Sequence, residues 1–218
     1  MAGRFEAVIF DFGGVITESP FEAFNRLEAG RGLPRDFIRQ VNAANPDGNA
    51  WARFERAEID AAAFDAQFAA EARALGHELE GSAVLAVLSG SIRPAMVAAL
   101  DRLADAGLRL ACITNNVPTG HGAGMARSGD ARDAYEQVFA RFEHVIESSK
   151  AGVRKPDPRI YRLMCEKLGL GPERCIYLDD LGINCKPAAM LGMHAIKVVS
   201  GEQALADLSD VLGLALTA

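Results

Sequence analysis

The sequence predicts an α/β fold, in which a parallel sheet is packed against helices and a further module is inserted after the first strand. Five short apolar runs of strand length are separated mostly by helical stretches, the pattern typical of a parallel sheet. About 100 residues lie between the first and the second run, which is too long for a single crossover connection. The chain has 218 residues, 50% of them hydrophobic, which is enough for one such core.

The predicted strands cover residues 6–10, 109–113, 144–147, 175–178 and 195–199. The helix between the third and fourth strands has clear ends, because Asp157 is suited to cap it, Pro158 fits its first position and Gly169 is suited to end it. Residues 94–106 have the same helical pattern. Residues 202–216 are expected to form an amphipathic helix that closes the sheet.

Composition excludes several classes of protein. The formal net charge of −6 argues against a nucleic-acid partner. No apolar run approaches the roughly 20 residues that span a bilayer, and the first residues lack the layout of a signal peptide. The four cysteines form no C-x-x-C pair, so buried free thiols in a reducing compartment are expected. We therefore expect a cytoplasmic protein without a membrane partner.

Polar side chains follow the predicted strands at the points where these end. Asp11 follows the first strand, Thr114 and Asn115 follow the second, and Asp179 and Asp180 follow the fourth. Lys155 comes eight residues after the third strand. Because ligand sites of parallel sheets form outside the carboxyl ends of the strands, these residues are expected to share one site.

This set of residues suits phosphoryl transfer. Asp11 and Asp180 offer carboxylate oxygens to a hard divalent cation such as Mg²⁺. Thr114 and Asn115 offer hydrogen bonds to phosphoryl oxygens, and Lys155 adds a positive charge. With the phosphoryl charge neutralised, the Asp11 carboxylate is suited to attack phosphorus in line, which makes Asp11 and Lys155 the predicted catalytic residues. Gly13 and Gly14 are expected to allow a tight turn after Asp11.

Four motifs in this order resemble those of the haloacid dehalogenase (HAD) superfamily of phosphohydrolases. They are DFGGV at 11–15, ITNN at 113–116, RKPDPRIY at 154–161 and YLDDLGIN at 177–184. Within the superfamily, the longer runs around the last two motifs are similar to the N-terminal phosphatase domain of soluble epoxide hydrolase. They are also similar to the N-terminal domain of acyl-CoA dehydrogenase family member 10.

The resemblance implies a Rossmannoid, three-layer core with the strand order five-four-one-two-three. Residues 1–16 and 93–218 would form this HAD-like core, and residues 17–92 a helical cap. It also implies that Asp11, the backbone carbonyl of Gly13 and Asp180 are the Mg²⁺ ligands, with Asp179 and Asn184 as supporting residues. Thr114, Asn115 and Lys155 would hold the phosphoryl group of a small phosphorylated metabolite.

The sequence departs from the pattern at Gly13, where most phosphatases of this superfamily carry a second aspartate as general acid and base. Losing such a group typically costs roughly 10²–10⁴-fold in rate. Substrates with good leaving groups, such as acyl or aryl phosphates, are expected to suffer least. Two other consequences stay open: Glu18 replaces the missing group, or the domain binds a phosphorylated ligand without useful turnover.

A second alternative is a metal-independent 2-haloacid dehalogenase, which uses the same aspartate to attack carbon. Such enzymes generally lack the pair of acids found here at Asp179 and Asp180, so the pair favours metal and phosphate. Residues 118–131, rich in glycine and small side chains, are either a mobile lid over the site or an ordinary insertion.

Overall fold

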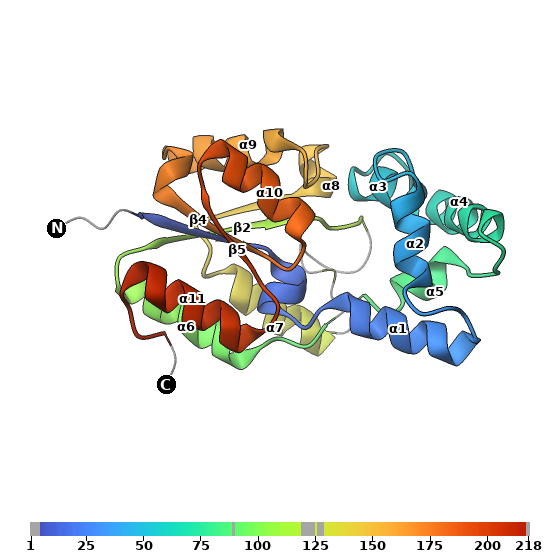
Figure 1. The fold of residues 1–218 in the computed structure, drawn as a ribbon, viewed down its shortest axis with the longest axis horizontal. Coiled ribbons are helices and arrows are strands. Elements are labelled where there is room, and N and C mark those ends of the chain that lie inside the picture. Colours follow the sequence, from blue (N-terminus) through green and yellow to red (C-terminus); the bar gives the residue numbers. More distant parts are fainter. Residues whose placement is uncertain (1–4, 89, 119–124, 126–128, 217–218) are drawn as a thin grey trace.

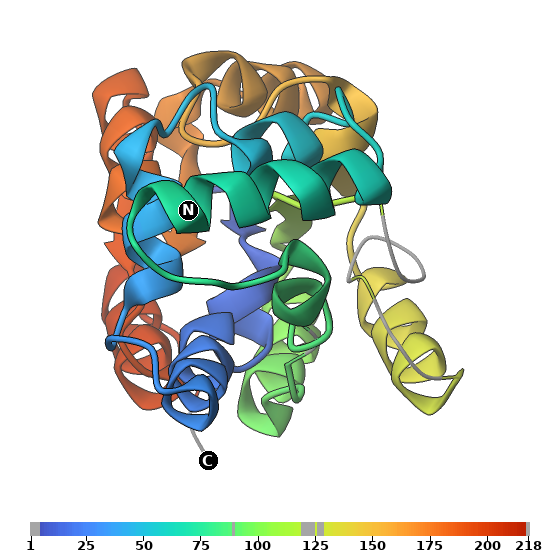
Figure 2. The ribbon, with the colours of Figure 1, turned by 90° about the vertical axis from the view of Figure 1, so that its right-hand side faces the viewer.

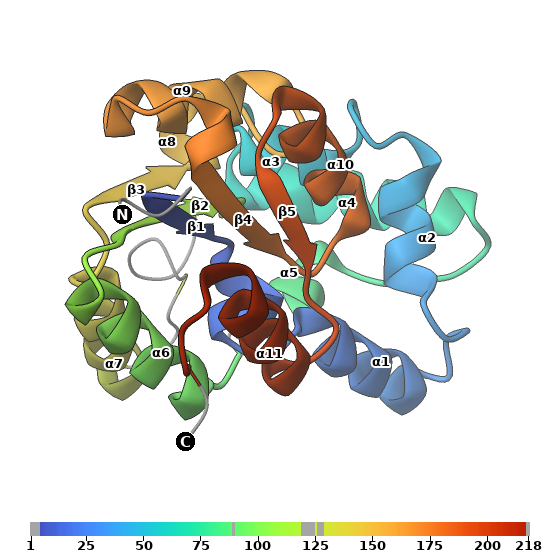
Figure 3. The same cartoon turned by 60° about the vertical axis from the view of Figure 1, so that its left-hand side comes forward.

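The computed structural model describes residues 5–88, 90–118, 125 and 129–216, and a five-stranded parallel sheet lies at its centre. The strands are β1 (Ala7–Phe10), β2 (Arg109–Thr114), β3 (His144–Glu147), β4 (Cys175–Asp179) and β5 (His194–Lys197). Their order across the sheet is β3-β2-β1-β4-β5 (Figure 3), which confirms the order that the resemblance implied. The central position of β1 places Asp11 between the ends of β2 and β4.

Helices cover both faces of the sheet and make three layers (Figure 1). Because successive strand residues point to opposite faces, Val8 and Phe10 enter one apolar cluster while Ala7 and Ile9 enter another. The first cluster is closed by α6 (Pro94–Asp105), α7 (Gly129–Phe139) and α11 (Gly201–Leu212). The second is closed by α9 (Pro158–Leu168) and α10 (Gly182–Leu191). The predicted α/β class is confirmed.

Local capping chemistry explains where α9 begins and ends. The Asp157 side chain accepts a hydrogen bond from the backbone N–H of Arg159 at 2.9 Å, and Pro158 is the first helical residue. Gly169 follows the helix with φ of 62°, a left-handed conformation that favours glycine. The three signals predicted from the sequence are therefore all used.

Two predicted boundaries differ from the structure by two residues or more. The fifth strand was expected to reach residue 199 but ends at Lys197, because its partner in register, Asp179, is the last residue of β4. Val199 beyond it is 72% exposed. The last helix was expected over 202–216 but ends at Leu212, because Gly213 follows with φ of 66°.

In the part of the chain that the structure describes, five helices lie between β1 and α6 and form what we call the inserted module. They are α1 (Pro20–Arg31), α2 (Phe37–Ala44), α3 (Ala50–Glu55), α4 (Ala61–Ala74) and α5 (Gly81–Leu85). Their apolar faces share a separate cluster that contains five buried phenylalanines, and Figure 2 shows these helices in front of the sheet. Val117, from the loop after β2, also enters this cluster. The boundaries of 17–92 expected for a cap stay a prediction.

The two connections between the inserted module and the sheet run side by side. Thr17 and Ile92 form an antiparallel bridge. The N–H of Glu18 donates to the carbonyl of Ser91 at 2.8 Å, and the N–H of Arg93 donates to that of Ile16 at 2.9 Å. The module therefore leaves and rejoins the chain close to the turn that follows Asp11.

Two expectations from composition also have outcomes. The four cysteines are buried and free, as predicted. Within the described part of the chain, no helix combines the length and the apolar character needed to cross a membrane.

Candidate active site

A tight turn directly after β1 positions Asp11. Residues Phe12–Ile16 form a tight turn closed by the N–H of Thr17, which donates to the carbonyl of Phe12 at 3.1 Å, and Asp11 Oδ1 accepts the backbone N–H of Phe12 at 2.6 Å. Asp11 is only 8% exposed. Burial, reinforced by the charges of Asp179 and Asp180 and opposed by Lys155, raises the pKa of Asp11 well above its usual value. The turn thus holds a carboxyl group in a buried place at the end of the central strand.

The two glycines of this turn have different roles. Gly14 has φ of 77°, and a Cβ built on it would lie 2.1 Å from Asp180 Oδ2. Gly13 has φ of −70° and ψ of 130°, which any residue adopts, and a Cβ there would meet nothing within 4 Å. A tight turn follows Asp11, as expected, and of its two glycines Gly14 is the one whose conformation and surroundings require glycine. Position 13 has room for a side chain.

Lys155 lies between two of the predicted carboxylates. Its Nζ is 2.8 Å from Asp11 Oδ1 and 2.8 Å from Asp179 Oδ2, and the residue is 1% exposed. Burial alone disfavours the charged ammonium, but the two carboxylates outweigh it and raise the pKa of Lys155 above its ordinary value. Lys155 is therefore a buried cation in direct contact with Asp11, the predicted nucleophile.

Asn115 holds the backbone of Lys155. Its side-chain oxygen accepts the N–H of Lys155 at 2.8 Å, and its side-chain nitrogen donates to the carbonyl of Lys155 at 3.0 Å. The two residues are 40 positions apart in the chain. The Asn115 side chain, which was predicted to bind phosphoryl oxygens, thus fixes the backbone of Lys155. Its contact with phosphate stays a prediction. Thr114, the last residue of β2, is buried beside it and pairs in register with Glu147.

Asp179 is fully buried and accepts hydrogen bonds from four groups. Lys155 Nζ and the Tyr177 hydroxyl reach Oδ2 at 2.8 and 2.5 Å. The N–H of Leu181 reaches Oδ1 at 2.8 Å, and Asn184 Nδ2 lies between the two oxygens at 3.0 and 3.1 Å. The predicted supporting pair of Asp179 and Asn184 is thus brought together, and Asp179 has its acceptor sites filled.

Asp180 lies in the same cluster of carboxylates as Asp11 and Asp179. Its Oδ2 accepts a hydrogen bond from the hydroxyl of Ser19 at 3.1 Å, just before α1. Burial, with the charge of Asp179, raises the pKa of Asp180 to about 6. One carboxylate oxygen each from Asp11, Asp179 and Asp180 lies within 4.8 Å of the others. An all-oxygen donor set with close carboxylates fits a hard cation such as Mg²⁺.

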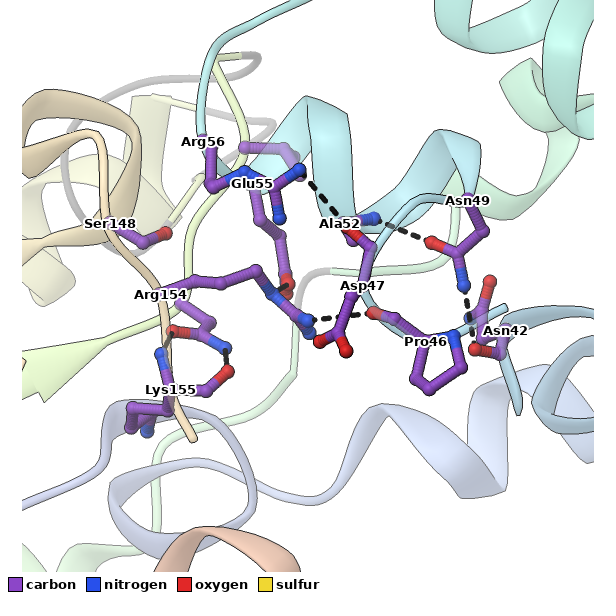
Figure 4. A network of polar contacts seen from close by, with 12 residues as sticks. Asn42, Pro46, Asp47, Asn49, Ala52, Glu55, Arg56, Ser148, Arg154 and Lys155 are labelled. Atoms are coloured by element: carbon purple, nitrogen blue, oxygen red, sulfur yellow. Dashed lines mark hydrogen bonds and ion pairs between the residues drawn. The ribbon is translucent and has the colours of Figure 1, made fainter. Parts of the chain in front are cut away.

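Arg154 connects the loop of Lys155 to the inserted module (Figure 4). Its Nε donates to Glu55 Oε2 at the end of α3, and its Nη1 donates to the carbonyl of Pro46 at 3.2 Å. The Glu55 side chain is 7% exposed and that of Arg154 19%. The residue next to Lys155 is therefore tied across the junction between the sheet and the module.

Sequence reasoning missed Tyr177, Ser19 and the contact between Arg154 and Glu55. A signal existed for Tyr177, because residues two apart on a strand share a face, and Tyr177 precedes Asp179 by two. No local signal marks the other contacts, which join residues 99 and 161 positions apart.

The hypothesis that Glu18 replaces the missing acid gains no support. Glu18 is exposed and lines a surface cavity of about 410 Å³ with Arg93, Arg102 and Glu202, and no site carboxylate borders that cavity. Most of residues 118–131, expected to be either a lid or an ordinary insertion, lie outside the described residues, so both alternatives stay open.

Comparison with known proteins identifies relatives over nearly the whole chain. Residues 5–192 match the model of the haloacid dehalogenase-like hydrolase family. Acyl-CoA dehydrogenase family member 10 from Mus musculus is 33% identical over 97% of this chain, which spans 20% of that protein. Bifunctional epoxide hydrolase 2 from Mus musculus is 29% identical over 94% of this chain, which spans 38% of that protein. The chain thus covers a minor part of each relative.

Solved structures share the fold. A predicted HAD-like family hydrolase from Porphyromonas gingivalis has a TM-score of 0.67 at 23% identity, covering 96% of this chain and 98% of that one. A HAD family enzyme from Bacteroides thetaiotaomicron, in complex with magnesium and inorganic phosphate, has a TM-score of 0.56 at 19% identity, over 90% and 96%. L-2-haloacid dehalogenase from Xanthobacter autotrophicus has a TM-score of 0.60 at 24% identity, over 94% and 82%.

Proposed function

This chain belongs to the haloacid dehalogenase-like hydrolases, and within that family we propose that it is a magnesium-dependent phosphatase of small phosphorylated metabolites. One observation carries the proposal: Asp11 Oδ1 lies 2.8 Å from the buried ammonium of Lys155, in a cluster of three carboxylates. Such an arrangement places a nucleophile, a fixed cation and metal-binding oxygens at one point.

Asp11 and Asp180 are the residues that would hold Mg²⁺, together with the backbone carbonyl of Gly13. When bound, the cation neutralises part of the phosphoryl charge and stabilises the ionised forms of the two carboxyl groups, whose pKa values burial raises. Asp179 is less suited to the same task, because four donors already occupy its oxygens.

In the proposed reaction, a carboxylate oxygen of Asp11 forms a bond to phosphorus while the bond to the ester oxygen breaks. Lys155, beside that carboxylate, stabilises the negative charge on the transferred phosphoryl group. A water molecule then attacks the phosphorus of the aspartyl phosphate. The bond to Asp11 breaks, which restores the carboxylate and releases inorganic phosphate.

Gly13 narrows the range of good substrates. No carboxylate stands at this position to protonate the leaving oxygen, so the ester oxygen must depart as an anion or take its proton from water. Acyl and aryl phosphates have stable leaving anions and are the expected substrates. The chemical rate is expected to rise as the pKa of the leaving group falls, and a flat dependence would contradict this step.

The two rival functions have separate tests. A phospholigand-binding domain without turnover rests on Gly13, and a metal-independent 2-haloacid dehalogenase rests on the fold shared with solved dehalogenases. Chloride release from 2-chloropropionate that survives a chelator would support the dehalogenase. The acid pair at Asp179 and Asp180 favours the phosphatase over the dehalogenase, and turnover above that of Asp11→Asn would exclude the binding domain.

The deciding experiment measures inorganic phosphate released from an aryl phosphate and from an acyl phosphate. Each is assayed with Mg²⁺, with a chelator and with the Asp11→Asn protein. The proposal expects release that needs Mg²⁺ and falls by about 10⁴-fold or more without the Asp11 nucleophile. Release equal to that of Asp11→Asn on both compounds would overturn it and favour the binding domain.

A further inference from the structure

Tyr177 is a buried polar residue in the middle of the sheet. It is 0% exposed, and its strand neighbours Ile176 and Leu178 are apolar. Because Tyr177 and Asp179 are two apart on β4, their side chains lie on one face, and the Tyr177 hydroxyl donates to Asp179 Oδ2 at 2.5 Å. Burying a hydroxyl is costly without a partner, so this hydrogen bond fixes both groups.

The hydrogen bond shares its acceptor atom with Lys155. Oδ2 of Asp179 receives both the Tyr177 hydroxyl and Lys155 Nζ, at 2.5 and 2.8 Å. The same ammonium contacts Asp11 Oδ1 on its other side. A small rotation of the Asp179 carboxylate would therefore move Lys155 away from Asp11. The tyrosine hydroxyl opposes that rotation because it holds the same oxygen atom, Asp179 Oδ2.

We propose that Tyr177 is a positioning residue, whose hydroxyl locks the Asp179 carboxylate and thereby holds the ammonium of Lys155 beside Asp11. Its hydroxyl donates to Asp179, so it acts on Lys155 and Asp11 through that carboxylate. The consequence for phosphate binding rests on the proposed phosphatase function. The position of Lys155 does not, and it is measurable without any turnover.

Tyr161 provides a matched control for a change at Tyr177. It is also 0% exposed, and the two rings contact edge to face with centroids 5.2 Å apart. Its hydroxyl donates to the backbone carbonyl of Asn184 at 2.8 Å rather than to Asp179. Tyr161→Phe and Tyr177→Phe each remove one buried hydroxyl from the same cluster, but only the second removes a donor to Asp179.

The first test is nuclear magnetic resonance of protein labelled with ¹⁵N-lysine. The chain has five lysines, and Lys155 is buried while the other four are exposed. The buried ammonium is expected to give a signal protected from exchange with water. Tyr177→Phe is expected to shift this signal and to speed its exchange by about 10-fold. Tyr161→Phe is expected to change it much less, because Tyr161 contacts Tyr177 and Asn184 but donates no hydrogen bond to Asp179. An unchanged signal in Tyr177→Phe, or equal changes in both variants, would overturn the inference.

The second test is calorimetric binding of inorganic phosphate and of Mg²⁺ to the same three proteins. Tyr177→Phe is expected to raise the Kd for phosphate by about 10-fold and to leave the Kd for Mg²⁺ within about 2-fold, because Asp11 and Asp180 stay in place. A general loosening of the site would weaken both ligands and count against the inference. Failure of the wild-type protein to bind phosphate would count against the proposed function, while the lysine signal would still decide the role of Tyr177.

Discussion

The charged side chains at the carboxyl ends of the strands are mostly buried, whereas those of the inserted module are mostly exposed. We call the first region the sheet edge. At the sheet edge, Lys155 and Asp179 have side chains 1% and 0% exposed and contact each other at 2.8 Å. In the module, the ion pair of Arg73 and Glu78 joins side chains that are 52% and 76% exposed. Oppositely charged side chains therefore form a buried cluster in one region and a hydrated surface in the other.

This contrast has an energetic consequence. Exposed ion pairs contribute roughly 0–1 kcal/mol, because water screens them. A buried charge that loses its partner costs several times more, since neither water nor another ion replaces the contact. Sensitivity to single substitutions should thus concentrate at the sheet edge, and four predictions, from the largest expected effect to the smallest, test this difference.

The largest effect is expected at Lys155. Lys155→Met leaves Asp11 and Asp179 buried without their shared cation, and the free energy of unfolding is expected to fall by about 3–5 kcal/mol. Arg73→Met, the matched change in the module, is expected to cost below about 0.5 kcal/mol. Denaturant unfolding of the three proteins measures both values. Similar losses in the two variants would contradict the contrast.

The two glycines of the turn after β1 test the difference in sensitivity to substitution within the site itself. Gly14→Ala forces a left-handed conformation on alanine and drives Cβ toward Asp180, so we expect a loss of about 1–3 kcal/mol and weaker Mg²⁺ binding. Gly13→Ala has neither problem and is expected to keep wild-type stability within about 0.5 kcal/mol. Thermal unfolding and Mg²⁺ titration compare them, and equal effects would refute the assignment.

The junction between the regions should give an intermediate result. Glu55→Gln keeps the shape of the side chain but removes the charge that Arg154 contacts, with an expected loss of about 1.5 kcal/mol. Glu80→Gln, in the exposed pair with Arg31, is expected to change stability by less than about 0.5 kcal/mol. If chemical denaturation gives the same small loss in the free energy of unfolding for both variants, the ion pair at the junction contributes no more than an exposed one.

The smallest expected effect is the change in stability that follows from the protonation of Asp180 near neutral pH. Because the folded-state pKa of Asp180 is raised to about 6, its contribution to the stability of the metal-free protein is present at low pH and is lost as the pH rises through about 6. Mg²⁺ should therefore stabilise the protein more at pH 7.5 than at pH 5, where it must displace protons. Unfolding with and without chelator at both pH values measures this. Stabilisation that is greater at pH 5 would have the wrong sign.

Local patterns explain why much of the fold was predictable. The strands alternate with helices whose caps, such as Asp157 and Gly169, are readable from a few neighbouring residues. The strand ends followed by Asp11, Asn115 and Asp180 were also predictable from neighbouring residues, because each short apolar run stops at a polar side chain. The errors at residues 198–199 and 213–216 occurred where the length of a neighbouring strand, or a glycine next to an apolar run, set the boundary.

The contacts within the site were less predictable. Asn115 holds the backbone of Lys155, Ser19 contacts Asp180 and Arg154 contacts Glu55, all across long stretches of chain. Gly13 and Gly14 look alike in the sequence, and only their dihedral angles and the nearby Asp180 separate them.

The sequence by itself determined the fold class, the order of the strand-end motifs and the family. These depend on periodicity, capping and motif spacing, which act over a few residues or one element. The tertiary structure decided which oxygens of the three aspartates are engaged, that the Tyr177 hydroxyl donates to Asp179, and that position 13 has room for a side chain. Those features depend on side chains meeting from strands and loops far apart in the chain, and only packing the sheet brings them within hydrogen-bond distance.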